Sequence, residues 1–198
     1  MQKNFTRRSN KERTEATRAA LIAAARMLFV DKGYADTSTP EIVNAAKVTR
    51  GALYHHFADK ADLFRAVVER EAQAVAEQIE RNTTEPTSAL NALASGATAY
   101  FNAMAIPGRV RLLLLDGPYA LGHTEMHRID QNTGGEKLRQ GLAFALDDNN
   151  RTNVSLDALA DVLSAAFDRA ALAITDGKNA DEYKAAIQLI LNRLLKPD

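Results

Sequence analysis

Two histidines, His123 and His127, stand four residues apart in a stretch with helical periodicity. At that spacing both imidazoles lie on one face of a helix, where they could ligate a divalent metal ion. The stretch differs from the H-E-x-x-H pattern of metalloproteases, because Glu125 stands at the wrong offset and no third ligand is evident nearby. We therefore expect no metal and no other cofactor. A helical metal-binding protein or enzyme centred on His123 and His127 is kept as the alternative function.

A second group of side chains is suited to reading DNA. Arg50 carries a planar fork of donors that matches the two major-groove acceptors of guanine. Small residues beside it would let a duplex approach closely. The charge of Lys60, at the start of a long helix, could hold a phosphate. The predicted DNA contacts are Ser38, Thr39, Lys47, Thr49, Arg50, Gly51, Ala52, Tyr54, His55 and Lys60.

Two short helices must position these side chains. Ser38 and Glu41 have the spacing of a capping box, which predicts a short helix over residues 39–46. Thr49 can cap a second short helix, whose inward side carries Leu53. In the histidine pair that follows, we expect His55 at the groove and His56 in packing.

Longer helices surround this pair. Apolar residues recur with helical period over residues 14–32, and another amphipathic helix begins near Asp59. The polar stretch 80–88 is the expected domain boundary. Further helices are predicted over 89–104, 110–115, 118–146 with breaks at Gly122 and Gly134-Gly135, 156–175 and 181–195. The fold class is therefore all-α, with about nine helices.

Charge is unevenly distributed along a chain whose net charge is zero. Residues 1–60 hold 11 Lys or Arg against 6 Asp or Glu, while residues 61–198 hold 14 against 19. A cationic front of this kind favours contact with a polyanion. Its basic arm could follow a DNA backbone or be a solvated tail, and it carries Lys3, Arg7, Arg8, Lys11 and Arg13.

The chain contains no cysteine, which removes disulfides, thiolate metal sites and a cysteine nucleophile. Its first residues begin no apolar signal region. The longest wholly apolar run, residues 19–25, is far shorter than the roughly 18 residues of a membrane span. We therefore expect a cytoplasmic protein with no membrane partner.

Three motifs follow one another in the first third of the chain. F-x-x-x-G-Y begins at Phe29, T-S-x-x-E-I at Thr37, and G-A-L-Y-H-H-F-x-x-K-x-x-L-F at Gly51. In order and spacing they resemble the tetracycline-repressor (TetR) family of bacterial transcription regulators, over about residues 14–68. One position departs from the family pattern, because Lys47 stands where relatives usually have the glycine of the turn.

The resemblance implies a homodimer that binds double-stranded DNA at a pseudo-palindromic operator and leaves it when a small-molecule effector binds. It implies no catalysis, so the protein is expected not to be an enzyme. The expected domains are a basic arm (1–13), a helix-turn-helix DNA-binding domain (14–60), a connecting helix (61–80) and a ligand-binding and dimerisation domain (81–198). At Lys47, a non-glycine residue with positive φ costs about 1 kcal/mol or more. Either the turn is reshaped, or the added cation is kept near phosphate.

The effector pocket is expected among the helices of the last domain. L-D-G-P-x-x-L-G followed by R-I-D resembles the C-terminal halves of some such regulators, in which aromatic residues often occupy the two histidine positions. This favours a pocket wall over a metal site. Candidates that combine apolar walls with a few polar groups are Tyr100, Phe101, Met104, Tyr119, His123, Met126, His127 and Phe167.

The helices over 156–175 and 181–195 carry wide apolar faces. One face consists of Leu159, Val162, Leu163, Ala166, Phe167 and Ala170, and the other of Tyr183, Ile187, Ile190, Leu191 and Leu194. Faces of this width need covering. They either complete the core of the subunit or meet their symmetry mates in a four-helix dimer bundle, which is the arrangement that the resemblance favours.

Overall fold

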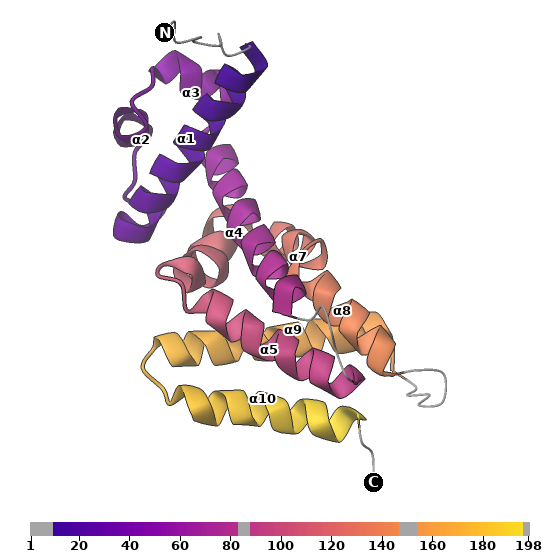
Figure 1. Ribbon diagram of the computed structural model, residues 1–198. Helices are drawn as coiled ribbons and strands as arrows, with labels where there is room; N and C mark the ends of the chain where they lie inside the picture. The colour runs from indigo at the N-terminus through magenta and orange to yellow at the C-terminus, as the bar shows by residue number, and fades with distance from the viewer. Residues whose placement is uncertain (1–9, 83–87, 147–153, 196–198) are drawn as a thin grey trace, which may run out of the picture. The chain divides into compact units, whose positions relative to one another are not determined.

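A computed structural model describes residues 10–82, 88–146 and 154–195 of the 198-residue chain (Figure 1). Within these ranges the fold is all-helical, with ten α-helices, one short π-helix and no strand. The chain divides into two compact units, Met1–Val68 and Glu69–Asp198. The division lies inside a continuous helix, α4 (Lys60–Asn82), whereas the sequence suggested a boundary in the polar stretch after it.

The first unit contains three helices and the start of α4. They are α1 (Asn10–Lys32), α2 (Thr39–Ala45) and α3 (Arg50–His56). Its centre is aromatic, because Phe29 meets Phe64 edge to face at 5.0 Å between ring centroids and Tyr34 lies 4.8 Å from Phe64. Edge-to-face pairs add to the stabilisation from burial. The short helices therefore rest on a rigid base.

The second unit contains the rest of the chain. Its elements after α4 are α5 (Ala89–Met104), η1 (Arg111–Asp116), α6 (Gly117–Leu121), α7 (His123–Gln131), α8 (Gly134–Ala145), α9 (Leu156–Thr175) and α10 (Ala180–Leu195). The predicted helices over 89–104 and 156–175 are confirmed. The predicted breaks are also confirmed, since Gly122 separates α6 from α7 and α8 begins at Gly134.

The segment predicted as an α-helix over 110–115 is instead the π-helix η1. A physical reason lies just beyond it. Pro118 has no N–H to donate to the carbonyl four residues earlier, and the wider turn of a π-helix accommodates such a missing bond. The sequence prediction was therefore right about helicity and wrong about the type of turn.

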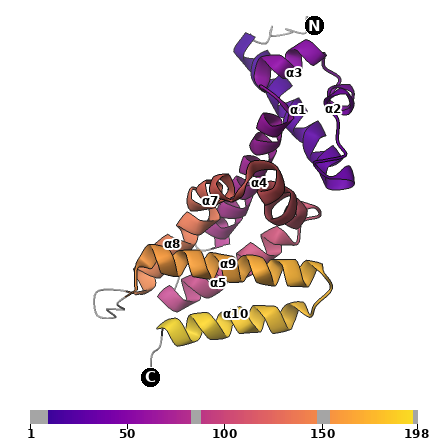
Figure 2. The ribbon, with the colours of Figure 1, turned by 180° about the vertical axis from the view of Figure 1, so that it is seen from behind.

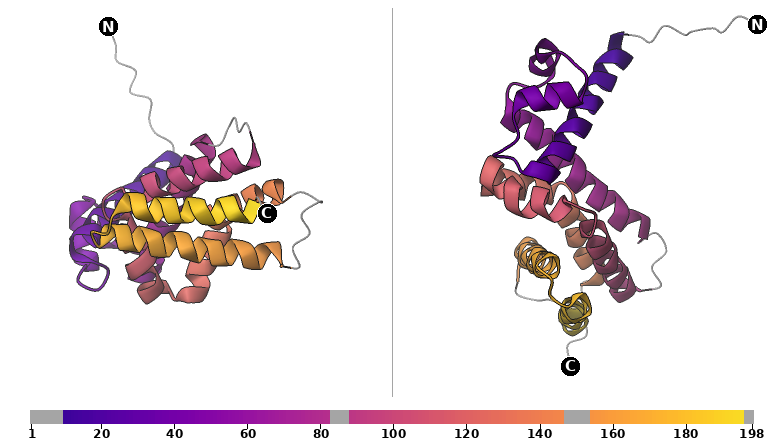
Figure 3. Two further views of the ribbon diagram at one scale, coloured as in Figure 1. Left: turned by 90° about the horizontal axis from the view of Figure 1, so that it is seen from below. Right: turned by 90° about the vertical axis from the view of Figure 1, so that its left-hand side faces the viewer.

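Helices α5, α8, α9 and α10 enclose the core of the second unit. Phe101 of α5, Phe167 of α9 and Leu191 of α10 are buried together there. Figures 2 and 3 show α9 and α10 side by side, and α9 also packs against α8. Most of the two predicted dimer faces belongs to this core or packs against it, as for Leu159, Leu163, Ala166, Phe167, Ala170, Tyr183, Ile187, Leu191 and Leu194.

Three large apolar residues of these two helices stay exposed. They are Val162 of α9 and Leu189 and Ile190 of α10, with exposed fractions of 68%, 60% and 46%. Most residues of the two apolar faces therefore pack in the subunit's own core, and these three are the large apolar side chains of α9 and α10 that a partner could cover.

Candidate functional site

The entry to α2 is fixed by a reciprocal cap. Glu41 accepts hydrogen bonds from the backbone N–H of Ser38 at 2.9 Å and from its hydroxyl at 2.7 Å. The Ser38 hydroxyl in turn caps the amide of Glu41, as the sequence predicted. The ammonium of Lys32 also contacts Glu41, and these contacts, led by that of Lys32, lower the pKa of Glu41 to about 2. The carboxylate of this cap is therefore ionised at neutral pH.

The turn between α2 and α3 keeps the conformation that glycine usually supplies. Lys47 has φ of 54°, in the left-handed region. The backbone N–H of Val48 donates to the carbonyl of Val43 at 3.0 Å. Of the two alternatives considered for Lys47, the reshaped turn is thus not observed. The lysine accepts the strain, and its side chain is exposed on the same turn.

Helix α3 presents one polar side to solvent and buries the other. The hydroxyl of Thr49 accepts from the amide of Ala52 at 3.1 Å, so the cap is confirmed. Leu53 is fully buried. On the outer side, the Arg50 guanidinium lies 5.5 Å from the centre of the Tyr54 ring. This contact presents the guanidinium in front of an aromatic surface.

The remaining predicted DNA contacts on α2 and α3 fit the same surface. Gly51 is exposed, and a Cβ added to it would contact only the Thr49 hydroxyl, at 3.9 Å, beyond its own chain neighbours and helix backbone. A hydrogen bond from Thr39, followed by one from Arg50, lowers the pKa of Tyr54. His55 is exposed, whereas His56 is half-buried and its pKa is lowered, first by burial. The histidine pair is therefore oriented as expected.

Lys60, predicted to hold a phosphate, directs its ammonium to backbone carbonyls of the loop before α2. Its ammonium donates to the carbonyls of Tyr34 at 2.9 Å and Thr37 at 3.1 Å, and lies 4.3 Å from the centre of the Tyr34 ring. The first amides of α4 are also capped, since Asp59 accepts from the amide of Asp62 at 2.8 Å. Convergent carbonyls thus satisfy the cation, and Lys60 ties the loop before α2 to α4.

The basic arm is shorter than expected. Helix α1 begins at Asn10, not near residue 14, so Lys11 and Arg13 are exposed residues of its first turns. The run of good helix formers around them explains the earlier start. The other three basic residues of the arm, Lys3, Arg7 and Arg8, lie outside the described residues.

A cavity of about 780 Å³ lies inside the second unit. Six of the eight predicted pocket residues line it: Tyr100, Met104, His123, Met126, His127 and Phe167. Phe101 is not among the lining residues and is buried in the helical core, while Tyr119 is 76% exposed. The structure therefore places these two residues outside the cavity wall, because Phe101 packs in the core and Tyr119 of the short α6 is exposed.

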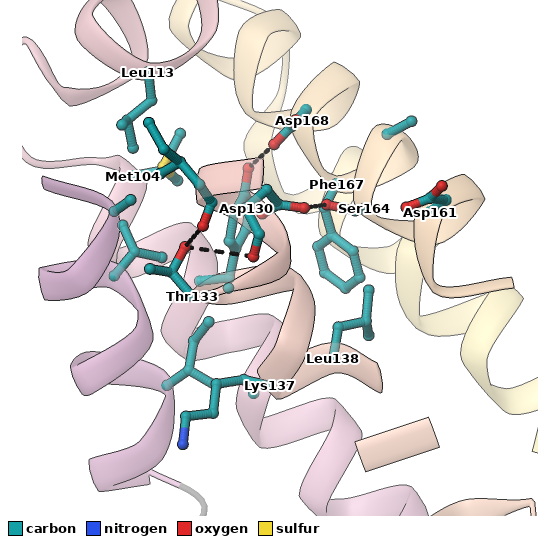
Figure 4. A pocket seen from close by; sticks show the side chains of 18 of the residues that line it. Met104, Leu113, Asp130, Thr133, Lys137, Leu138, Asp161, Ser164, Phe167 and Asp168 are labelled. Atoms are coloured by element: carbon teal, nitrogen blue, oxygen red, sulfur yellow. Dashed lines mark hydrogen bonds between the residues drawn. The ribbon is translucent and has the colours of Figure 1, made fainter. Parts of the chain in front are cut away.

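Two carboxylates lie in the wall of this cavity. Tyr100 donates its hydroxyl proton to Asp168 at 2.7 Å. Ser164 donates to Asp130 at 2.9 Å (Figure 4). The Gly135 amide donates to the other carboxylate oxygen of Asp130 at 3.2 Å. A Cβ on Gly135 would lie 2.6 Å from that side chain, so only glycine allows this approach.

Burial governs the titration of both carboxylates. It is the largest cause that raises the pKa of Asp168 to about 6, against the opposing hydrogen bond from Tyr100. Burial likewise raises the pKa of Asp130, against the bonds from Ser164 and Gly135. Tyr100 has a pKa well above its ordinary value, first because it is buried and then because of Asp168. The three groups therefore meet in a poorly solvated place.

The sequence reasoning missed these acids. A usable signal was present in α9, where Asp161, Ser164 and Asp168 form a polar stripe at helical spacing within an otherwise apolar segment. All three residues line the cavity. Asp130 follows the buried Ile129 in α7, and its role depends on contacts to α8 and α9 that no local pattern encodes.

The two histidines at the cavity do not gather further ligands. Nδ1 of His127 lies 3.8 Å from Asp161. Among the described residues, no group of three or more His, Cys, Asp or Glu side chains is arranged to hold a metal ion. Within residues 10–82, 88–146 and 154–195, none of the helices has the length and hydropathy of a membrane span.

Comparison with protein families gives two matches. Residues 21–67 match the family described as bacterial regulatory proteins, tetR family. Residues 90–197 match the tetracyclin repressor-like C-terminal domain. Together they include α3 and almost all of the second unit after α4.

Individual proteins agree with these matches. The chain is 38% identical over 87 residues to the HTH-type transcriptional regulator AcrR of Shigella flexneri, covering 43% of this chain and 40% of that one. It is 27% identical over 156 residues to the Transposon Tn10 TetC protein of Escherichia coli, covering 79% of each. A solved TetR-family transcriptional regulator from Pectobacterium atrosepticum superposes with a TM-score of 0.71 at 29% identity, over 95% of this chain and 96% of that one.

Proposed function

Because this chain belongs to the TetR family of bacterial regulatory proteins, we propose that it is a sequence-specific DNA-binding regulator of transcription, released from its operator by a small-molecule effector. The observation that carries the proposal is the outer side of α3. It is a capped helix with a buried inner side, and it exposes a cation, an aromatic ring and a glycine. This function requires no catalysis. Because it requires contact with chromosomal DNA, we propose that the protein acts in the cytoplasm.

Arg50 is the proposed base reader. Its fork can donate to both acceptors of a guanine, and each such bidentate pair contributes about 1–3 kcal/mol of discrimination against other bases. The Tyr54 ring beneath the guanidinium restricts its orientation before DNA arrives. Thr49, Tyr54 and His55 would complete the contacts, and the exposed Lys47 would approach the phosphate backbone.

The cavity is the proposed effector site, and α4 is the element through which it acts. Ala72, Val75 and Ile79 of α4 line the cavity, while the first residues of the same helix belong to the DNA-reading unit. An effector lowers the DNA affinity if it binds more tightly to the position of α4 in which the DNA-reading unit binds DNA poorly. The loss equals the difference in the effector's binding free energy between the two positions.

The operator geometry requires a dimer. Isologous pairing through the exposed residues of α9 and α10, Val162, Leu189 and Ile190, would place two copies of α3 on half-sites at least about one helical turn apart. The operator would then be a pseudo-palindrome.

The test is a footprint and a band-shift titration on DNA that flanks the gene itself. Wild type should protect one discrete site, with an affinity that falls as salt rises. Arg50→Ala should lose discrimination at one base pair of each half-site. Arg81→Ala removes the same charge from the far end of α4 and should leave the site unchanged.

A non-specific DNA binder would behave differently. Arg50→Ala would then weaken binding to all duplexes alike, and no discrete footprint would appear. Either result, if wild type is folded, would contradict the proposed function.

A further inference from the structure

We propose that the effector is an organic cation with aromatic or otherwise apolar bulk, bound in the cavity by Asp130 and Asp168. The inference rests on the proposed function only in treating the cavity as the effector site. It adds a chemical class, which follows from the charges and walls of the cavity.

The groups that donate hydrogen bonds to the carboxylates of Asp130 and Asp168 are all neutral in the described structure. Asp168 accepts from the Tyr100 hydroxyl, and Asp130 from the Ser164 hydroxyl and the Gly135 amide. Each carboxylate offers about four acceptor positions, so both retain acceptors for a ligand. Among the described residues, neither forms an ion pair with a lysine or arginine.

The cations of the neighbourhood are occupied elsewhere. Lys137, the one lysine or arginine of the described cavity wall, pairs with Glu80 at 3.3 Å. Figure 4 shows its ammonium directed away from Asp130 and Asp168. Just outside the wall, Arg128 pairs with Glu69 and Glu125. Of the histidines in the wall, His127 lies 3.8 Å from Asp161, and its charge, against the larger effect of burial, lowers the pKa of Asp130. Among the described residues no lysine or arginine neutralises Asp130 or Asp168, and burying such charge is unfavourable until a cation does so.

The rest of the wall suits a bulky apolar body. Tyr100 and Phe167 meet edge to face at 5.3 Å between centroids, and Met104, Met126 and Leu138 line the same space. Aromatic faces attract organic cations, and methionine adapts to irregular ligands. A volume of about 780 Å³ lies in the range of drug-sized ligands. An anion of equal size would gain the same apolar contacts and would be repelled by both carboxylates.

Two ions of nearly equal size and opposite charge provide the test. Tetraphenylphosphonium and tetraphenylborate differ in sign of charge and little in shape. Equilibrium dialysis of the full chain with each ion should show the phosphonium bound at least about tenfold more tightly. Equal binding, tighter binding of the borate, or binding of neither ion would overturn the proposal.

Two variants test whether the preference for the phosphonium ion comes from Asp130 and Asp168. Asp168→Asn removes the charge and keeps an acceptor oxygen for the Tyr100 hydroxyl. Asp130→Asn also removes the charge; its oxygen can accept from the Gly135 amide, and its new NH₂ group can donate to the Ser164 hydroxyl. Each should weaken phosphonium binding about tenfold or more and leave borate binding unchanged or stronger. Asp176→Asn removes the same charge after the end of α9, outside the cavity wall, and should change neither. Unchanged phosphonium binding in both cavity variants would contradict the assignment, and the wild-type preference is a test that needs no variant.

The result is separable from the proposed function. A specific footprint without cation preference would refute the effector class alone. Cation binding without any specific footprint would refute the regulatory function and leave the ligand class standing.

Discussion

At the scale of single residues, the burial of Asp168 makes the stability of the fold depend on pH. Its pKa is raised to about 6 by burial, while the unfolded chain titrates at its ordinary value near 4. The folded state therefore holds the proton more tightly. The stabilisation from this proton is fully present below about pH 4 and is lost as pH rises through about 6.

Asp168→Asn should therefore stabilise the protein at about pH 7.5, by up to roughly 3 kcal/mol, and the gain should vanish near pH 4. Urea unfolding at several pH values measures this difference. Asp176→Asn serves as the exposed control. A stability gain that is the same at every pH would contradict the assignment of the pKa to Asp168.

Lys47 allows a second prediction at this scale. With φ of 54°, its backbone is strained in a way that glycine is not. Lys47→Gly should raise the free energy of unfolding by about 0.5–1 kcal/mol, after allowing for the greater freedom of glycine in the unfolded chain. Lys47→Ala keeps the strain and removes the charge, so thermal melting should show no comparable gain. Equal stabilisation by both changes would point to charge as the cause.

The residues that the sequence predicted well are those whose environment is local. Thr49, Leu53 and His56 take the places that capping and helical spacing assign them. Lys60 and the cavity acids could not be predicted in this way, because Lys60 is bound by carbonyls about 25 residues away in the chain and Asp168 by Tyr100 of another helix.

At the scale of elements, a buried ion pair connects α4 to the end of the α5 segment. Nε of Arg109 lies 3.0 Å from Glu71, and a second nitrogen donates to the carbonyl of Ala103 at 2.8 Å. Both side chains are almost completely buried. Four residues after Arg109, Leu113 of η1 lines the cavity. The ion pair between Arg109 and Glu71 therefore holds this part of the cavity wall to α4.

Removal of one partner leaves the other charge buried. Glu71→Met or Arg109→Met should each destabilise the protein by about 3–5 kcal/mol, while the double variant should recover most of the loss. A double-mutant cycle by urea unfolding measures the coupling. Additive losses in the double variant would mean that the two side chains act independently.

Helix limits followed closely from caps and periodicity, as for α5 and α9. The exceptions have identifiable causes. The start of α1 depended on the good helix formers of its first turns, and the π-helix η1 depended on the missing amide of Pro118. Which apolar faces pair with which is not encoded locally. The sequence therefore left open whether the faces of α9 and α10 complete the subunit's core or meet a partner, and in the structure most of their residues pack in the core.

At the scale of the whole molecule, the prediction concerns assembly. Val162→Glu and Ile190→Glu place a charge on the proposed dimer face and should shift the protein from dimer to monomer at micromolar concentration. Phe144→Glu, on α8 with 65% of its surface exposed, is the control and should remain dimeric. Sedimentation velocity distinguishes the two states. A monomeric wild type, or charged variants that stay dimeric, would exclude this interface.

The central claim is that α3 reads a specific sequence, and selection of bound duplexes from a random-sequence library tests it most directly. Wild type should strongly enrich one inverted repeat whose half-sites each contain a guanine that Arg50→Ala no longer selects. Retention of duplexes without any enriched sequence, or an Arg50→Ala variant that selects the same bases at every position, would contradict it.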